Sequence, residues 1–383
     1  MLAIHNANLV LENGILWDGT LLVKDGMIAA CGKSSDMHIP KDAQVIDAEG
    51  AYVGPGFVDI HVHGGGGHVF EKDPLATADF FLRHGTTTIL STPCYDLTFS
   101  EFLEAIKKGK AAMKAGGAGR AIAGFYMEGP YMNTEYGACA SYNPWRHPMD
   151  PKEYKALIEE AGEYAKVWAI APEREGLQPF LEYARKVNPN VRFSIGHSEA
   201  TPDQIHSMGS RYRPVLQTHC TNATGRVNAK NGIRGTGPDE YCLQDPEMYV
   251  ELISDSCATH VQPKMQQLIL RCKGINRVVL ITDSTVFDLP NPPEYSNVPD
   301  INFDDEGNVN GSKLTMDQAC RNIMTHTNCG ITQAFLMASR NPARVIGLDH
   351  EIGTIEVGKK ANLVIVDDRF NVKKVLLEGS VVE

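Results

Sequence analysis

The chain has 383 residues and a formal net charge of −11 at pH 7. This length suits one barrel of about 250 residues with a smaller companion domain. No basic tract is present, which argues against a nucleic-acid partner, although a local arginine cluster could still bind an anionic substrate. No apolar stretch approaches the ~18 residues of a membrane span. Nine scattered cysteines without C-x-x-C pairs, and an N-terminus without a signal-peptide pattern, predict a reduced, cytoplasmic protein.

Both ends of the chain resemble short strands joined by tight turns. Turn-forming segments punctuate the N-terminal part, namely Glu12-Asn13-Gly14, Asp18-Gly19 and Asp25-Gly26. Near the C-terminus, 361–367 and 375–379 predict a strand and a hairpin. Because the middle lacks this pattern, we expect one small β-sandwich domain formed by 1–53 and 353–383. The segment 54–352 would then be a separate domain inserted between them.

The middle of the chain repeats a strand-then-helix pattern. Eight strands are predicted, at 56–63, 86–92, 121–128, 166–172, 191–197, 214–219, 249–255 and 278–283. Helix starts follow several of them, with capping pairs at Thr98/Glu101, Asp150/Glu153, Thr201/Gln204 and Thr315/Gln318. Eight alternating units predict an α/β fold, specifically a (β/α)8 TIM barrel. The Pro-, Asn- and Asp-rich segment 288–311 is predicted to be a long loop after the last strand, and such loops are often lids.

His61 and His63 close the first predicted barrel strand, which runs from Gly56 through an apolar segment. Residues two apart in a strand point to the same side, so both imidazoles converge on one point. Neutral imidazole is the commonest metal ligand in proteins. For this pair alone, a hydrogen-bonded structural histidine is about as good an interpretation, and the other strands must decide.

Five of the eight predicted strands end in a histidine, glutamate or aspartate. The residues are His61, His63, Glu128, His197, His219 and Asp283. Each residue alone is weak evidence for a metal site, because an isolated histidine is usually structural and an aspartate after a strand is often a helix cap. Together they would meet at the carboxyl end of the barrel, where active sites of this fold lie. Burying so many ionisable groups together is costly without a cation, so we favour a metal site.

Imidazole and carboxylate ligands without thiolate fit Zn²⁺, Fe²⁺ or a similar ion. Six candidate ligands exceed the needs of one tetrahedral zinc, and two ions bridged by a carboxylate would use them all. Such ions make hydroxide available near neutral pH. A proton carrier is still needed for the leaving group, and Asp283 is the candidate catalytic residue for that role.

These motifs resemble the amidohydrolase superfamily over nearly the whole chain. The resemblance lies in Pro55-Gly56-Phe57-Val58-Asp59-Ile60-His61-Val62-His63-Gly64, the strand-end histidines, the strand-8 aspartate, Asn341-Pro342-Ala343-Arg344 and the segment 353–364. Within the superfamily, the sequence most resembles N-acetylglucosamine-6-phosphate deacetylases. Met127-Glu128-Gly129-Pro130 is similar to that family's metal-glutamate motif, and Thr282-Asp283-Ser284 is similar to its catalytic aspartate motif.

The resemblance also implies substrate contacts. Thr218-His219-x-x-Asn222-Ala223 is similar to a turn that contacts substrate in the family, which implies roles for Asn222 and Ala223. Cys139 follows Gly137-Ala138, where the family usually has a histidine. Arg234 and His260, in motifs that match more loosely, would hold a phosphate. For Arg234 a solvated surface arginine is nearly as good an interpretation. Asn222 could merely form an Asx turn, and Cys139 could be a small buried apolar residue.

The resemblance implies a metal-dependent hydrolase that removes the acetyl group from a phosphorylated N-acetylamino sugar. It implies one or two divalent ions, zinc or iron, and a homodimer. Two alternatives remain at this point. One is another amide hydrolase of the same superfamily, acting on a cyclic amide or a dipeptide. The other is a non-catalytic scaffold, which the presence of every candidate ligand argues against.

Overall fold

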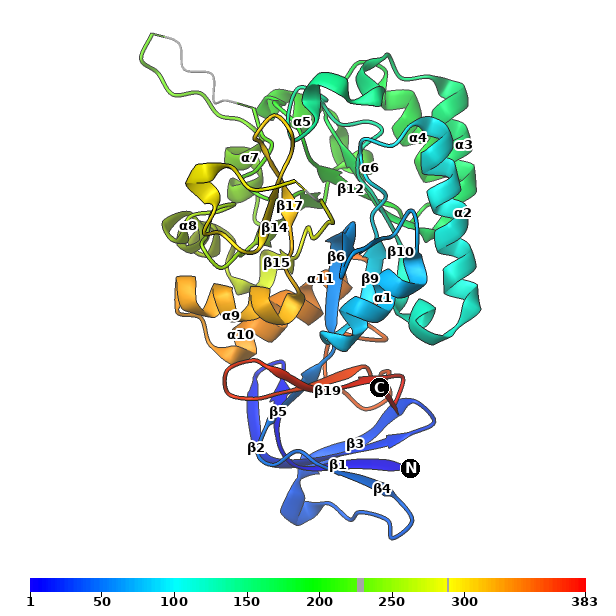
Figure 1. Cartoon of the computed structure of the whole chain (residues 1–383), viewed down its shortest axis with the longest axis vertical. Helices are drawn as coiled ribbons and strands as arrows, with labels where there is room; N and C mark the ends of the chain where they lie inside the picture. Colours follow the sequence, from blue (N-terminus) through cyan, green and yellow to red (C-terminus); the bar gives the residue numbers. More distant parts are fainter. Residues whose placement is uncertain (226–230, 288) are drawn as a thin grey trace.

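Eight parallel strands form a barrel in the computed structural model, which describes residues 1–225, 231–287 and 289–383. They are β6 (Phe57–Val62), β9 (Thr86–Ser91), β10 (Ile122–Met127), β11 (Ala165–Ile170), β12 (Arg192–Ile195), β13 (Leu216–Gln217), β14 (Tyr249–Ile253) and β15 (Val278–Ile281). Each pairs with the next along the chain (Figure 1). Each lies within or overlaps a predicted strand, and the predicted TIM-barrel fold is confirmed.

Hydrogen bonds join the first and last barrel strands near their carboxyl ends. The Thr282 hydroxyl donates to Asp59 Oδ2 at 2.6 Å, and the Asp283 amide donates to the His61 carbonyl at 3.0 Å. Every residue of β6, β9 and β15 is buried. This burial explains the continuous apolar sequence of β15, because a parallel strand covered on both faces has no solvent side.

Helices connect the barrel strands along the outside. Their bounds are α1 (Pro74–Arg83), α2 (Phe99–Ala115), α3 (Pro151–Ala161), α4 (Leu177–Val187), α5 (Pro202–Ser207), α6 (Gly209–Tyr212), α7 (Pro238–Gln244), α8 (Pro263–Lys273), α9 (Met316–Thr327), α10 (Ile331–Phe335) and α11 (Asn341–Val345). The predicted capping boxes are present at Thr98, Thr201 and Thr315. At Asp150 the carboxylate accepts from the Lys152 amide at 2.8 Å. Local sequence therefore fixes where these helices begin.

Strands from both ends of the chain form a second sheet, which lies below the barrel in Figure 1. They are β1 (Leu2–Leu11), β2 (Gly14–Lys24), β3 (Met27–Lys33), β4 (Gln44–Asp47), β5 (Tyr52–Pro55), β18 (Leu363–Val366), β19 (Val372–Leu377) and β20 (Ser380–Val381). The two ends join where β5 pairs with β18. The predicted β domain made of both termini is thus observed. Its division from the barrel at 53 and 353 stays a prediction, because β5 runs across residue 53.

The alternation of side chains along β18 shows how this terminal sheet contacts the barrel. Leu363 and Ile365 belong to the core of the terminal sheet. Val364 and Val366 face the other way and join the barrel's largest apolar cluster, which includes Phe57 and Phe335. The two faces of one strand therefore hold the two parts of the molecule together.

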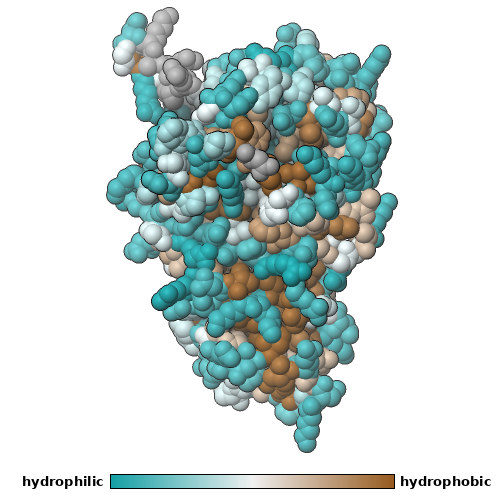
Figure 2. All heavy atoms as spheres, viewed as in Figure 1, coloured by the Kyte–Doolittle hydropathy of each residue, from teal (hydrophilic) through white to brown (hydrophobic). Residues whose placement is uncertain are grey.

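The terminal sheet also exposes apolar side chains. Trp17 is 59% exposed although its ring packs edge-on against Tyr52, and Val45 is 50% exposed. Figure 2 shows apolar residues gathered on the lower part of the visible face, where this sheet lies. Within the described residues, no helix combines the length and apolar character needed to cross a membrane.

The segment predicted as a long loop over 288–311 is instead partly ordered as a hairpin. Position 288 itself lies outside the described residues. Strand β16 (Ile301–Phe303) pairs antiparallel with β17 (Val309–Ser312). The turn between them is closed by Asp304, whose carboxylate Oδ1 accepts from the amides of Glu306 and Asn308. Polar turn residues thus closed a hairpin where composition alone indicated an open loop.

A substitution at Gly54 tests how tightly the terminal sheet packs against the barrel. A Cβ atom on this buried glycine of β5 would lie 2.1 Å from Cε1 of Phe335. We expect Gly54→Ala to lower the free energy of unfolding by about 1–3 kcal/mol, because the ring cannot move away freely. Urea unfolding followed by circular dichroism measures the loss. Adding Phe335→Leu should restore part of it, and a stability equal to the unsubstituted protein in the single variant would contradict the packing.

Candidate metal centre and active site

Five barrel strands deliver ionisable side chains to the same end of the barrel. The side chains are His61 and His63 at the end of β6, Glu128 after β10, His197 after β12, His219 after β13 and Asp283 after β15. All six are buried. Their donor atoms form two groups, within each of which every atom lies within 4.8 Å of the others. One group holds His61, His63, Glu128 and Asp283, and the other holds Glu128, His197 and His219. The structure therefore brings the predicted residues together.

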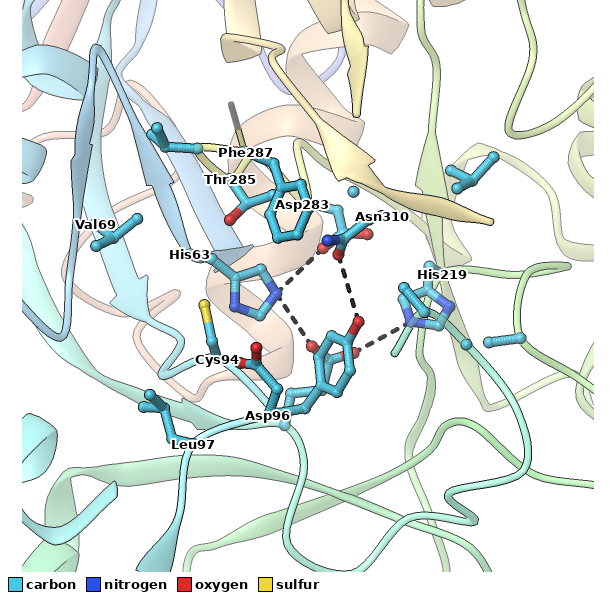
Figure 3. Close-up of a pocket in the computed structure, with 18 of the residues that line it drawn as sticks. His63, Val69, Cys94, Asp96, Leu97, His219, Asp283, Thr285, Phe287 and Asn310 are labelled. Atoms are coloured by element: carbon cyan, nitrogen blue, oxygen red, sulfur yellow. Dashed lines mark hydrogen bonds and ion pairs between the residues drawn. The ribbon is translucent and has the colours of Figure 1, made fainter. Parts of the chain in front are cut away.

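Glu128 belongs to both groups because its two oxygens face different histidines. Its Oε2 lies 3.2 Å from His61 Nε2 and 3.0 Å from His63 Nε2. Its Oε1 lies 3.3 Å from His197 Nε2 and 3.2 Å from His219 Nε2. Asp283 Oδ1 completes the first group, 3.3 Å from His63 Nε2 (Figure 3). The arrangement could hold two cations with Glu128 as the bridging ligand.

Each of the four imidazoles has its outer nitrogen, Nδ1, next to a hydrogen-bond acceptor. The acceptors are Glu251 Oε2 for His61, Thr92 O for His63, Tyr136 O for His197 and Asn222 O for His219, at 2.9–3.2 Å. A proton on Nδ1 leaves the inner nitrogen, Nε2, with a lone pair that points into the cluster. The Nε2 atom of His61 is buried and has no hydrogen-bond partner among the described residues. These features fit a divalent metal.

The electrostatics of the cluster also fit a cation. Burial by itself lowers the pKa of His61, but the charges of Glu128 and Glu251 outweigh it and raise this pKa well above its usual value. Burial by itself raises the pKa of Glu128. The neighbouring histidines, with His61 contributing most, outweigh burial and hold this pKa well below the usual range. Protons on the imidazoles thus balance the carboxylates in the protein alone. A divalent cation would replace those protons, so metal binding releases them.

Three of these residues adopt a left-handed backbone conformation that non-glycine residues rarely adopt. The φ angles are +44° at His197, +25° at His219 and +48° at Asp283. Such conformations cost on the order of 1–3 kcal/mol each and persist only where surrounding structure imposes them. Gly137, with φ of +91°, passes so close that a Cβ atom there would lie 2.4 Å from the His197 ring. The loops that carry these ligands therefore adopt unusual backbone conformations and pack closely against the cluster.

A cavity of about 570 Å³ opens above the cluster. Three of the predicted substrate contacts line it, namely Asn222, Ala223 and His260. His260 Nδ1 lies 3.2 Å from the Asp255 carboxylate, and its Nε2 is buried without a partner among the described residues. Asp255 therefore holds the ring with one nitrogen free.

The other two predicted contacts, Cys139 and Arg234, do not line the cavity. Cys139 is buried. Its backbone amide donates to Asp304 Oδ2 at 2.8 Å, which fixes the local backbone. The Arg234 side chain is 78% exposed and pairs with Glu240 at 2.8 Å. Among the described residues, Lys72 is the single lysine or arginine on the cavity wall.

Several residues of the site were not predicted from the sequence. Glu251 is the clearest, since its Oε2 accepts from the His219 amide as well as contacting His61. A signal for it existed, because a charged residue stands in the middle of the buried strand β14. Tyr95 and Asn310 line the cavity and bond to each other at 3.4 Å. No sequence pattern predicts these two residues. Asn310 reaches the cavity from the hairpin, which was predicted to be a loop.

The barrel, with a buried imidazole and carboxylate cluster at the carboxyl ends of its strands, defines a TIM-barrel protein with a divalent-metal site. The chain matches the Amidohydrolase family over residues 52–382, which is most of its length. The chain belongs to the amidohydrolase family.

Two curated relatives are similar over nearly their full lengths. One is N-acetylgalactosamine-6-phosphate deacetylase of Escherichia coli O157:H7, 29% identical over 97% of this chain and 96% of the relative. The other is N-acetylglucosamine-6-phosphate deacetylase of Bacillus subtilis strain 168, 27% identical over 99% and 96%. A crystal structure of N-acetylglucosamine-6-phosphate deacetylase from Pasteurella multocida has the same fold. It superposes with a TM-score of 0.86 at 24% identity and covers 99% of both chains.

Glu251 offers a test of the cluster that leaves all inner nitrogens in place. We expect Glu251→Gln to weaken binding of Zn²⁺ by about 10- to 100-fold, because His61 loses the charged acceptor that orients its ring. Titration of the metal-free protein, with calorimetry as the readout, measures the affinity. Glu247→Gln, the same change at an exposed position, is the matched control and should leave affinity as it is. Equal affinities in both variants would show that Glu251 does not support the cluster.

Proposed function

We propose that this chain is a metal-dependent hydrolase that converts an N-acetylated amino-sugar phosphate, N-acetylglucosamine 6-phosphate or a close relative, to the amino-sugar phosphate and acetate. One observation carries the proposal. Asp283 Oδ1 lies 3.3 Å from His63 Nε2, beside the carboxylate-bridged histidines, where it could serve both water and a leaving amine. Full-length similarity to two amino-sugar phosphate deacetylases supports the choice of substrate.

The proposed metal ligands are His61, His63, Glu128, His197, His219 and Asp283. Two ions would use this whole set, one in each group of donor atoms, and zinc or iron suits nitrogen and oxygen donors. When bound, the ions provide hydroxide near neutral pH and polarise a carbonyl. The protein supplies the orientation, through the acceptors on each outer nitrogen, and excludes bulk water by burying every ligand.

Asp283 is proposed as the proton carrier. Burial opposes ionisation of its carboxyl group, but His61 and His63 hold its pKa below the usual value, so it is a carboxylate at neutral pH. It can therefore accept the proton of the attacking water. As the amide C–N bond breaks, it returns that proton to the departing nitrogen, which leaves as an amine. The water oxygen ends in acetate, and the carboxylate is regenerated.

His260 and Asn222 are proposed to hold the sugar phosphate. His260 lines the cavity, its Nε2 has no hydrogen-bond partner among the described residues, and Asp255 accepts from its other nitrogen. The Asn222 side-chain amide donates to the His260 carbonyl at 3.0 Å, which links the two residues, and Ala223 is adjacent in the chain. Arg234 could hold the phosphate only if its guanidinium released the ion pair with Glu240. Cys139 would affect substrate binding indirectly, through the position of its cavity-lining neighbours Gly137 and Ala138, rather than by contact with the substrate.

The proposal also includes a homodimer and a cytoplasmic location. Light scattering on the purified protein tests the first, and fractionation of the native cells tests the second. A monomer in solution would remove the dimer from the proposal and leave the chemistry as proposed.

A panel of substrates tests the reaction. We expect the metal-loaded protein to release acetate from N-acetylglucosamine 6-phosphate or N-acetylgalactosamine 6-phosphate, because the cavity provides both the hydrolytic cluster and His260. Hydantoins and β-aspartyl dipeptides represent the other amide hydrolases of the family. Activity on these compounds alone would overturn the proposed function. Absence of bound metal after reconstitution, together with absence of any hydrolysis, would favour a scaffold.

Substitution of Asp283 separates proton transfer from metal binding. We expect Asp283→Asn to keep its metal and to lose about 10²- to 10⁴-fold in kcat, because asparagine cannot carry the proton. Elemental analysis and steady-state kinetics give the two readouts. Glu128→Ala, by contrast, should lose metal and activity together, since both groups of donors share that residue. A kcat for Asp283→Asn close to that of the parent would show that another group carries the proton.

A further inference from the structure

The cavity contains a hydroxyl group that the proposed mechanism does not use. Tyr95 belongs to the segment between β9 and α2, and it lines the cavity. Among the described lining residues, Tyr95 and Thr285 are the two that carry side-chain hydroxyl groups. A phenol keeps its proton at neutral pH, so its O–H group is an uncharged hydrogen-bond donor. A donor of this kind suits a site in which negative charge forms during the reaction.

Two contacts place the Tyr95 ring next to the cluster of proposed metal ligands. The ring centroid lies 5.7 Å from that of His197, which belongs to the second group of donor atoms. Gly129 follows Glu128 in the chain, and a Cβ atom on Gly129 would lie 2.7 Å from Tyr95 Cα. The residue therefore packs against the side of the cluster that holds His197 and Glu128.

The hydroxyl end of the ring extends toward the other group of donor atoms. The Tyr95 hydroxyl donates to Asn310 Oδ1 at 3.4 Å. Asn310 lies beside Asp283 in Figure 3, and the Ser312 amide, two residues further on, donates to the Asp283 carbonyl at 2.8 Å. The phenol thus extends from His197 in one group to the neighbour of Asp283 in the other.

The acceptors around this hydroxyl are poor. An O–H···O hydrogen bond is usually about 2.7–2.8 Å long, so the contact with Asn310 is a weak one. Another acceptor within hydrogen-bonding reach is the Cys139 sulfur. Thiol sulfur accepts weakly, and this atom already accepts from the Tyr142 hydroxyl at 2.8 Å. A donor with such partners gains from meeting a charged oxygen, because charge-assisted hydrogen bonds are roughly twice as strong as neutral ones.

The backbone around Tyr95 is fixed by its surroundings. The Asn143 side-chain amide donates to the Tyr95 carbonyl at 3.3 Å, and the Trp145 indole donates to the Leu97 carbonyl at 2.9 Å. The hydroxyl is therefore held in the cavity before any substrate arrives. A donor oriented in advance stabilises a developing charge without the cost of reorganising during the reaction.

We propose, on the basis of the proposed function, that Tyr95 is a further catalytic residue whose hydroxyl donates a hydrogen bond to the carbonyl oxygen of the scissile amide as that oxygen gains negative charge. Water adds to the carbonyl carbon, and an electron pair of the C=O double bond moves to the oxygen. When the C–N bond breaks, the double bond forms again and the nitrogen leaves with the proton that Asp283 carries. Tyr95 keeps its own proton throughout and exchanges Asn310 for a stronger acceptor.

Removal of one oxygen atom tests this role. We expect Tyr95→Phe to lower kcat by about 10²-fold and to leave KM within about twofold, because the hydrogen bond strengthens only in the transition state. Zinc content and zinc affinity, measured by elemental analysis and calorimetry, should equal those of the parent, because the hydroxyl is not a proposed ligand. The ring stays in place, so its packing against His197 is kept.

Tyr142→Phe is the matched control. It removes the other hydroxyl that contacts the Cys139 sulfur, from a residue that does not line the cavity. We expect this variant to keep the parent kcat. An equal loss in both variants would show that the two hydroxyls act through Cys139, and it would overturn a direct role for Tyr95.

A tetrahedral inhibitor separates binding of the transition state from binding of the substrate. The N-methylphosphonyl derivative of the amino-sugar phosphate places a charged oxygen where the carbonyl oxygen gains its charge. Its inhibition constant should rise in Tyr95→Phe by about the factor by which kcat/KM falls, and it should stay at the parent value in Tyr142→Phe. An inhibition constant that is the same in Tyr95→Phe and the parent would contradict the inference.

The outcomes separate the two proposals. Failure of the parent to hydrolyse any N-acetylhexosamine phosphate would overturn the proposed function and this inference with it. With an active parent, a parental kcat in Tyr95→Phe would overturn the inference alone, and a raised KM at unchanged kcat would make Tyr95 a binding residue instead. Loss of zinc from Tyr95→Phe would show that the hydroxyl supports the cluster rather than the reaction.

Discussion

The two oxygens of Glu128 hold the site together. One faces His61 and His63, which come from the first barrel strand, and the other faces His197 and His219, from strands on the opposite side. A buried carboxylate in this position is stable only beside positive charge. In the protein alone that charge is carried by protonated imidazoles, and a divalent cation can replace it. The cavity above, Asp283 and the positions of the loops all depend on this one centre.

The orientation of the histidines depends mainly on the main chain. Three of the four outer nitrogens bond to backbone carbonyls, those of Thr92, Tyr136 and Asn222. A carbonyl cannot be removed by changing a side chain, so these supports tolerate substitution provided that the loops keep their path. Of the three ligands with left-handed backbone conformations, His219 lies in the same loop as Asn222, whereas His197 and Asp283 lie in the loops after β12 and β15. Loop conformation and ligand geometry are therefore one property of this barrel.

Sequence patterns predicted the parts of this protein that follow local rules. The barrel strands, the helix caps and the strand-end ligands obey residue spacing, and a parallel barrel brings strand ends to one rim. Glu251 was missed because its contact with His61 joins residues 190 positions apart. Backbone acceptors such as Thr92 O leave no trace in residue type. Arg234 was predicted from a motif, yet its guanidinium pairs with Glu240, because a motif carries no information about which neighbour a surface side chain meets.

The pairing of β5 with β18 has a consequence for how the protein is made. Val53 pairs with Ile365, about 310 residues later. At about 5–20 residues per second on the ribosome, β18 is synthesised between 15 seconds and a minute after β5, the strand with which it pairs. During that interval β5 can pair with β1 on one side, but the backbone edge that later pairs with β18 stays open. Chaperones that shield nascent chains would therefore act most strongly on the N-terminal segment, and a slow ribosome would lengthen its exposure to aggregation.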